Sequence, residues 1–335
     1  MSHEIMGNFE SFLTEKDIPE SKAGQYLAIA EKFDDFLKQI EHKPSADLSM
    51  HEQVNRFSEM LIDQGLNTRD SYRALMAYGQ YLKNNDIYIV ALELIDGAEA
   101  LDNLYARIGK KLGQQKQDEI FDSAKPPPLG TPTCQMPGIT RIVMERLETA
   151  ADATTIAGML SGSLRDLKDE WFEGVREKFL QCRDIDEFIE RKGEDFISSL
   201  ERLRDQSELF FTQEIDDNVI EFVRTNPEIR QGVRKGDVLY ETKIPYMTRE
   251  WLAEADESLQ RYYYCHCPWV RESLKEGQIP VSPTFCICSA GFHKRYWEVA
   301  VDQPLQAEVV ETVLKGDHRC RFAIHLPETC LPSNK

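Results

Sequence analysis

The chain has 335 residues and carries 58 Asp and Glu against 40 Lys and Arg, a formal net charge of −18 at pH 7. That length is sufficient for two domains of ordinary size. The acidic balance repels phosphate backbones and anionic lipid surfaces, so it disfavours nucleic acids and membranes as partners. An aromatic content of 10% and a mixture of both charges argue against disorder over most of the chain.

The first residues contain no basic segment followed by an apolar core. No run of about 18 uncharged apolar residues occurs anywhere in the chain. We therefore expect a cytoplasmic protein without a membrane span. In a reducing cytosol, closely spaced thiols indicate metal binding or catalysis before disulfides.

In the first third of the chain, apolar residues recur at helical spacing in residues 26–37, 54–61 and 72–82. Residues 67–70 offer an N-cap for the third of these helices, and Gly65 offers a stop for the second. The pattern predicts an all-α helical bundle over residues 1–123.

Five prolines fall within residues 124–138. Proline cannot donate a backbone hydrogen bond and disrupts a helix interior, so this segment is expected to be an extended, exposed linker. The second domain is then predicted to span residues 139–335, and helices are expected to continue to about residue 223.

Beyond that point, residues 238–245 and 261–267 are rich in β-branched and aromatic side chains, which favours strands. Residues 305–314 and 319–326 flank a Gly-Asp turn like the two arms of a hairpin. The predicted fold class is α+β: a helical bundle followed by an α+β domain with an antiparallel sheet.

Six of the eight cysteines and four of the seven histidines lie between residues 265 and 330. Most occur in three short segments, residues 265–269, 286–293 and 316–320. Thiolate and imidazole groups bind soft or borderline metals and form nucleophiles, so the clustering predicts a functional site in the last fifth of the chain.

Metal binding is the first hypothesis for these thiols, with zinc as the expected ion and iron as the alternative. On a straight strand, Cα atoms two residues apart lie roughly 6.6 Å apart, whereas two sulfurs on one zinc lie about 3.8 Å apart. A Cys-X-Cys pair on a straight strand is therefore a poor chelate, but it works better where the chain turns, and Pro268 and Gly291 are close enough to permit turns. The alternative is one thiolate from each pair, joined by Cys320. The candidate ligands are Cys265, Cys267, Cys286, Cys288 and Cys320. A catalytic or redox thiol and a plain buried core remain the alternatives.

The neighbouring histidines and glutamates have simpler explanations. His266 is expected to be a surface or hydrogen-bonded residue, and His293 to cap or pack at a helix start. If the hairpin pairs Leu314 with Arg319, Glu311 shares a face with Cys320, and Glu308 lies on the side of His325.

The apolar pattern of residues 9–13, 26–37 and 72–82 resembles the helical core-binding domain of tyrosine recombinases, which clamps DNA. The resemblance implies DNA binding as an alternative function. Residues 1–120, however, carry 13 Lys and Arg against 21 Asp and Glu, a net charge of −8, where a DNA clamp needs a basic face. The chain also lacks the family's Arg, His-X-X-Arg, His and Tyr constellation, so it is not expected to be an active recombinase.

Residues 285–291 and 308–322 resemble the end of the 4-vinyl reductase type of small-molecule-binding domain, and of proteins grouped with 2-aminothiazoline-4-carboxylate hydrolase. For the sensor members, the resemblance implies zinc ligands at Cys286 or Cys288, at Glu308 and at Cys320. The remaining family cysteine falls on Glu311 or Thr312, which alters the site. The hydrolase group implies that a small heterocycle is opened by cysteine chemistry.

Two functions follow from these patterns. The principal expectation is a zinc-binding domain that binds a small molecule and can also act as a hydrolase. As an enzyme, the domain would use zinc-bound water or the Cys288 thiolate to attack a small polar substrate, and Glu308 or Glu311 would move the proton. As a binding module, the domain would be stiffened by a closed metal site and would sense a small molecule.

Overall fold

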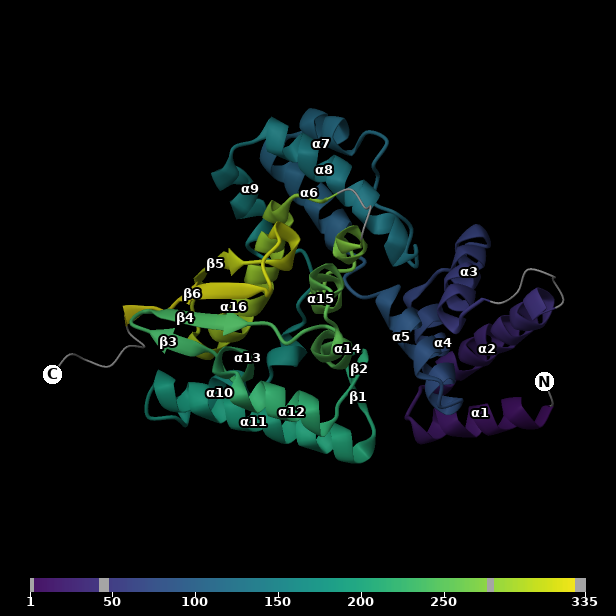
Figure 1. The fold of residues 1–335 in the computed structure, drawn as a ribbon. Helices are drawn as coiled ribbons and strands as arrows, with labels where there is room; N and C mark the ends of the chain where they lie inside the picture. The colour runs from purple at the N-terminus through teal and green to yellow at the C-terminus, as the bar shows by residue number, and fades with distance from the viewer. Residues whose placement is uncertain (1–2, 42–47, 276–279, 329–335) are drawn as a thin grey trace. The chain divides into compact units, whose positions relative to one another are not determined.

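The computed structural model describes residues 3–41, 48–275 and 280–328 (Figure 1). The chain divides into two compact units. The N-terminal unit comprises Met1–Ala98 with Pro126–Met136, and the C-terminal unit comprises Glu99–Lys125 with Pro137–Lys335. The predicted α+β class is confirmed, because helices dominate the described residues and the two small sheets are antiparallel. No helix in the described part of the chain is long and apolar enough to span a bilayer.

The N-terminal unit is helical, as predicted. Its helices are α1 (His3–Glu15), α2 (Glu20–Glu41), α3 (Met50–Asp63), α4 (Arg69–Tyr81) and α5 (Asn85–Glu93). Ser49 caps α3 in a reciprocal capping box with Glu52, and the Thr68 side chain caps α4. Their apolar faces meet in a core that includes the fully buried rings of Phe33, Phe57 and Tyr78.

The proline-rich segment is not the exposed linker that we expected. The Ser58 hydroxyl donates to the Gly130 carbonyl at 2.6 Å and lies 2.7 Å from the Tyr72 hydroxyl. Thr131 and Thr133 are also buried, at 6% and 8% exposure. Proline excludes a helix here but not packing, since an extended backbone offers carbonyls to the side chains of α3 and α4. Residues 99–125, in turn, belong to the C-terminal unit, so the division differs from a boundary at residue 123.

The C-terminal unit begins with helices and returns to them between its strands. The helices are α6 (Ala100–Leu112), α7 (Gln114–Phe121), α8 (Met136–Ala150), α9 (Ala153–Leu160), α10 (Val175–Leu180), α11 (Ile185–Gln206), α12 (Asp217–Thr225), α13 (Pro227–Arg230), α14 (Thr248–Ala253), α15 (Glu257–Tyr264) and α16 (Ile287–Val301). Short 3-10 turns occur in this unit at η2 (Asp169–Phe172), η3 (Arg271–Leu274), η4 (Pro283–Cys286) and η5 (Val313–Lys315), and η1 (Thr133–Gln135) belongs to the N-terminal unit.

Four strands form the main sheet in the order β3-β4-β6-β5, and each neighbouring pair is antiparallel. They are β3 (Val233–Lys235), β4 (Val238–Thr242), β5 (Gln306–Glu311) and β6 (Arg321–His325). A separate two-stranded sheet joins β1 (Leu209–Phe210) to β2 (Gln213–Glu214).

The predicted hairpin is the pair β5 and β6, and its register places Glu308 opposite Ala323, on the side of His325 as expected. An irregularity between Val309 and Glu311 shifts the pairing near the turn, so Glu311 lies opposite Arg321. The expected pairing of Leu314 with Arg319 therefore does not occur.

The strand predicted over residues 261–267 is wrong. Residues up to Tyr264 form the end of helix α15, and Cys265 begins a loop. The Asp256 side chain accepts a hydrogen bond from the Leu259 N–H at 2.9 Å and caps the helix. Burial of Tyr264, at 1% exposure, is achieved equally well from a helix, so tertiary packing overrides the β-propensity of its aromatic residues.

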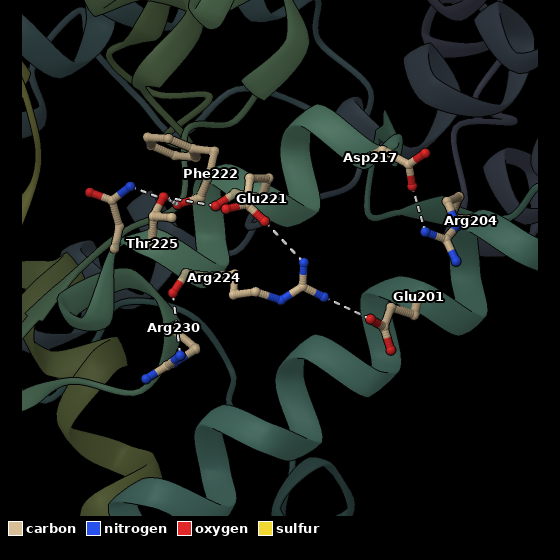
Figure 2. A network of polar contacts seen from close by, with 9 residues as sticks. Glu201, Arg204, Asp217, Glu221, Phe222, Arg224, Thr225 and Arg230 are labelled. Carbon is tan, nitrogen blue, oxygen red and sulfur yellow. Dashed lines mark hydrogen bonds and ion pairs between the residues drawn. The ribbon is translucent and has the colours of Figure 1, made fainter.

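Helices α11 and α12 are fastened together by charged side chains (Figure 2). Arg224 of α12 donates to Glu201 of α11 at 2.8 Å and to Glu221 of its own helix at 3.1 Å. Arg204 of α11 pairs with Asp217 at 2.5 Å. These contacts fix the position of α12, which carries Phe222.

Candidate functional site

Strand β4 carries charge on the side that should be apolar. Leu239 and Glu241 alternate onto the same face, opposite Ile324 and Phe322 of β6, and Lys243 continues that alternation just beyond the strand. Leu239 is fully buried, and Glu241 is only 6% exposed. A strand therefore passes from a hydrophobic core into a buried polar site within a few residues.

Helix α16 covers this face of the sheet and supplies the facing side chains. At helical spacing from its start, Ser289, His293 and Trp297 lie along one side of the helix. Ser289 Oγ accepts a hydrogen bond from Lys243 Nζ at 2.7 Å. His293 Nδ1 lies 3.2 Å from Glu241, and its ring stacks on Phe322 with centroids 4.6 Å apart. Trp297 closes the apolar end of the interface, fully buried.

Five cysteines surround this polar strip, and we refer to them as the thiol cluster. They are Cys265, Cys267, Cys286, Cys288 and Cys320. They come from three separated segments: the loop after α15, the start of α16 and the turn before β6. All five are free thiols, and Cys330 lies outside the described residues. The structure thus brings together all the cysteines predicted as metal ligands.

Thr312 lies between two members of the cluster. Its Oγ1 is 3.1 Å from Cys286 Sγ and 4.0 Å from Cys320 Sγ. This is one of the two positions on which the resemblance to the 4-vinyl reductase type places the remaining family cysteine. A hydroxyl, not a thiol, therefore lies between Cys286 and Cys320.

Burial keeps four of the thiols protonated at neutral pH. It raises the pKa of Cys265 to about 12, with the neighbouring Cys267 and Cys320 adding to the effect. Burial also raises the pKa of Cys267 to about 11, although Arg165 acts in the opposite direction. The pKa values of Cys286 and Cys320 are raised for the same reason, and Cys286 is also affected by Cys320, Cys265 and Cys267. The four thiols therefore lie within electrostatic range of one another.

Cys288 differs from the other members in its surroundings. It is the second residue of α16, and its Sγ accepts a hydrogen bond from the Leu164 N–H at 3.2 Å. Gly291, one turn further along, lies against the backbone of Ser161 and Ser163. On a helix, residues two apart do not face each other, so Cys286 and Cys288 point to different neighbours. The expectation that Gly291 permits a chain turn is wrong, because it lies within the helix and allows this close approach instead.

Glu241 is the buried anion of the site. Burial alone would raise its pKa, but Lys192 and His293 together lower it to about 2. Lys192 Nζ donates to Glu241 at 2.9 Å. Burial lowers the pKa of His293, and the contact with Glu241 compensates only in part. We conclude that Lys192 is the cation that pairs with Glu241 and that His293 is neutral.

Lys243 has no such carboxylate. Its hydrogen-bonding partner is the neutral Ser289 hydroxyl, and no carboxylate of the described residues lies within ion-pair distance. The cation also lies 5.9 Å from the centre of the Phe322 ring. A half-buried cation beside neutral thiols gives the site an unbalanced positive charge.

The two histidines near the cysteines have structural partners. His266 Nε2 lies 2.7 Å from the Ile244 carbonyl, to which it must donate, and this confirms the hydrogen-bonded role. Burial lowers the pKa of His266 well below its usual value, so the ring is neutral.

The two predicted catalytic glutamates are engaged elsewhere. Glu308 is 70% exposed and bonds to His325 at 3.1 Å. Glu311 accepts two hydrogen bonds from Arg319, at 2.8 and 2.9 Å. Neither carboxylate contributes to the interactions described above for the thiol cluster.

As the side chains stand, no group of three or more His, Cys, Asp or Glu residues in the described part of the chain is arranged to hold a metal ion. The donor types suit zinc, but their present positions do not. Each cysteine has a single side-chain torsion with three staggered positions. Convergence on an ion would therefore require rotation of several thiols.

Sequence reasoning missed Lys192, Glu241, Lys243 and Ser289. A signal was present in residues 239–243, where an alternating strand places two charges on the face of a buried leucine. Comparison of the chain with family models, curated proteins and solved structures finds no match.

Proposed function

We propose that the C-terminal unit is a metal-binding, small-molecule-binding domain whose thiol cluster takes a zinc ion. The observation that carries this proposal is the assembly of Cys265, Cys267, Cys286 and Cys320 from three distant segments within electrostatic range of one another. A plain hydrophobic core would not require Lys243 and Thr312 beside them.

Charge gives a second reason. Thiols bind zinc as thiolates, so binding replaces neutral S–H groups with negative charge. Burial raises the pKa values of Cys320 and Cys265, and Lys243, which stands beside the cluster without a carboxylate of its own, acts against that rise at both thiols. A cation in this position favours the thiolate form that a metal ion needs.

Protein produced in zinc-replete medium is expected to contain about one zinc per chain by elemental analysis, with iron measured in the same run. The double substitution Cys286→Ser and Cys320→Ser should lower that content at least about fivefold, because it removes sulfur ligands from two of the three segments. Because the thiols must lose protons from raised pKa values, zinc affinity should weaken as the pH falls below 7.

Cys182 provides the control, since it follows α10 and lies outside the cluster. Cys182→Ser should retain the wild-type zinc content. If wild-type protein contains neither zinc nor iron and all its thiols titrate as free, the metal proposal is wrong.

Hydrolysis by cysteine chemistry is a second candidate function, and the surroundings of Cys288 favour it. Catalytic cysteines use helix N-terminal turns and nearby N–H donors, and Cys288 has both. The next residue, Ser289, accepts a hydrogen bond from Lys243. Glu308 and Glu311 are not proposed for proton transfer, because His325 and Arg319 engage them.

Substoichiometric iodoacetamide at pH 7, followed by peptide mass spectrometry, tests this second candidate. Cys288 should be alkylated at least about tenfold faster than Cys267, because reactivity follows the thiolate and the pKa of Cys267 is raised to about 11. Both residues are partly exposed. Equal labelling rates would remove Cys288 as a nucleophile.

DNA binding is not part of the proposal. The acidic excess in residues 1–120 opposes contact with phosphates, which supplies most of the affinity in protein–DNA complexes.

A further inference from the structure

A cavity of about 410 Å³ lies within the C-terminal unit, beside the ends of β4 and β6. Thr242 lines it, and Thr242 alternates away from Glu241 and Lys243, so the cavity lies on the side of β4 opposite α16. Small-molecule sites usually have volumes of about 300 to 1,000 Å³. The cavity is therefore large enough for a compact ligand of one or two fused rings.

Three aromatic side chains form a continuous wall of this cavity. The Phe222 and Trp251 rings have centroids 5.2 Å apart, and the Trp251 and Tyr264 rings have centroids 5.9 Å apart. They come from α12, α14 and α15, and the ion pairs drawn in Figure 2 fix α12 against α11. The ring planes differ by 48° between Phe222 and Trp251 and by 80° between Trp251 and Tyr264, so the wall is not flat and a planar ligand can stack on one of its rings at a time.

The polar end of the cavity offers hydrogen-bond donors. Arg319 gives Nε and one Nη to Glu311, while its other Nη forms an ion pair with Glu228 at 3.7 Å without a hydrogen bond. Glu228 already accepts two hydrogen bonds from Arg321 and one from Thr242. The carboxylates of Glu228 and Glu311 are therefore balanced by the guanidinium groups of Arg319 and Arg321. The hydrogen-bond donors that remain at this end of the cavity belong to Arg319 and to the exposed His318.

We propose that this cavity binds a planar aromatic carboxylate, with its ring on the wall formed by Phe222, Trp251 and Tyr264 and its carboxylate at Arg319 and His318. A guanidinium group matches a carboxylate in charge and in geometry. The assignment rests on the small-molecule half of the proposed function and is independent of the metal.

Three residues that line the cavity are each followed in sequence by a residue of the thiol cluster or by Lys243. Thr242, Tyr264 and Arg319 line the cavity, and the residue that follows each of them is Lys243, Cys265 or Cys320. The Tyr264 hydroxyl also donates to the Lys243 carbonyl at 2.5 Å. A ligand on the aromatic wall therefore contacts residues directly adjacent to the proposed metal site.

The probe for this site is 2-naphthoate, titrated into full-length protein by isothermal calorimetry, with the neutral 2-naphthamide as its matched partner. Wild-type protein should bind 2-naphthoate at least about tenfold more tightly than the amide, because only the acid engages Arg319 as an anion. Arg319→Gln should abolish that preference. Trp251→Leu should weaken both probes at least about fivefold, because it removes the centre of the stacking wall.

Arg295→Met is the control, since this arginine lies on α16 and pairs with Asp169 and Glu298. It should bind both probes like the wild type, and circular dichroism of every variant verifies that it is folded. Absence of 2-naphthoate binding at millimolar concentration, equal affinity for acid and amide, or an unchanged preference in folded Arg319→Gln would each overturn the proposal. Zinc content measured on the same samples reports separately on the metal.

Discussion

Replacing Gly291 with alanine is expected to lower the free energy of unfolding by about 2 to 3 kcal/mol, an effect typical of overpacking in a dense interior. A Cβ at this position would lie 2.5 Å from the Ser163 nitrogen and still closer to the Ser161 carbonyl oxygen. Both neighbours are backbone atoms, so no side chain can rotate to make room. The gain in helix propensity of about 1 kcal/mol cannot compensate fully.

Gly158 provides the matched control, since it also lies inside a helix, α9, but a Cβ there would have no heavy atom within 4 Å. Gly158→Ala should therefore leave stability unchanged or raise it slightly. Urea unfolding of both variants at pH 7 measures the difference. Equal stability of the two variants would mean that α16 does not press against residues 161–163. In that case the hydrogen bond from Leu164 to Cys288 would also be in question.

Replacing Glu241 with glutamine is expected to destabilise the protein by about 3 kcal/mol at pH 7, since it leaves the Lys192 cation without its carboxylate. The Lys192 and Glu241 side chains are 22% and 8% exposed, so water screens the loss only weakly. The double substitution Glu241→Gln with Lys192→Met should recover part of this loss, because it removes the uncompensated charge as well. Asp195→Asn, which breaks an exposed pair with Lys178, should have little effect.

The pH dependence of the same pair has a definite sign. The pKa of Glu241 is lowered from 4.5 in the unfolded chain to about 2 in the folded protein. The stability contributed by its ionisation is therefore complete above about pH 4.5 and is lost as the pH falls towards 2. Glu241→Gln should show a flatter stability profile over that interval than the wild type. Urea unfolding from pH 5 to pH 2.5 measures both profiles. Parallel profiles for the two proteins would contradict the assignment of Glu241 as the ionised partner.

Local sequence patterns were sufficient for helices α2, α3 and α4 of the N-terminal unit and for the hairpin of β5 and β6. Apolar spacing in residues 54–61 and 72–82 corresponds to α3 and α4, and Thr68 caps α4 as residues 67–70 indicated. The cysteine spacing likewise indicated the region of the candidate site, where thiols from residues 265–320 lie near one another. These features depend on periodicity and residue type, which are present in the chain before it folds.

Other features depend on partners distant in sequence, and only the tertiary structure decided them. The segment around Gly130 packs because Ser58 and Tyr72 lie beside it, and Tyr264 ends a helix because packing outweighs its β-propensity. Glu241 and Lys243 belong to the site because α16 places His293 and Ser289 against them. The sequence by itself determined which residue types are present for the candidate site. The fold determined which of them meet, because the cost of burying a charge or a thiol is set by neighbours from other segments.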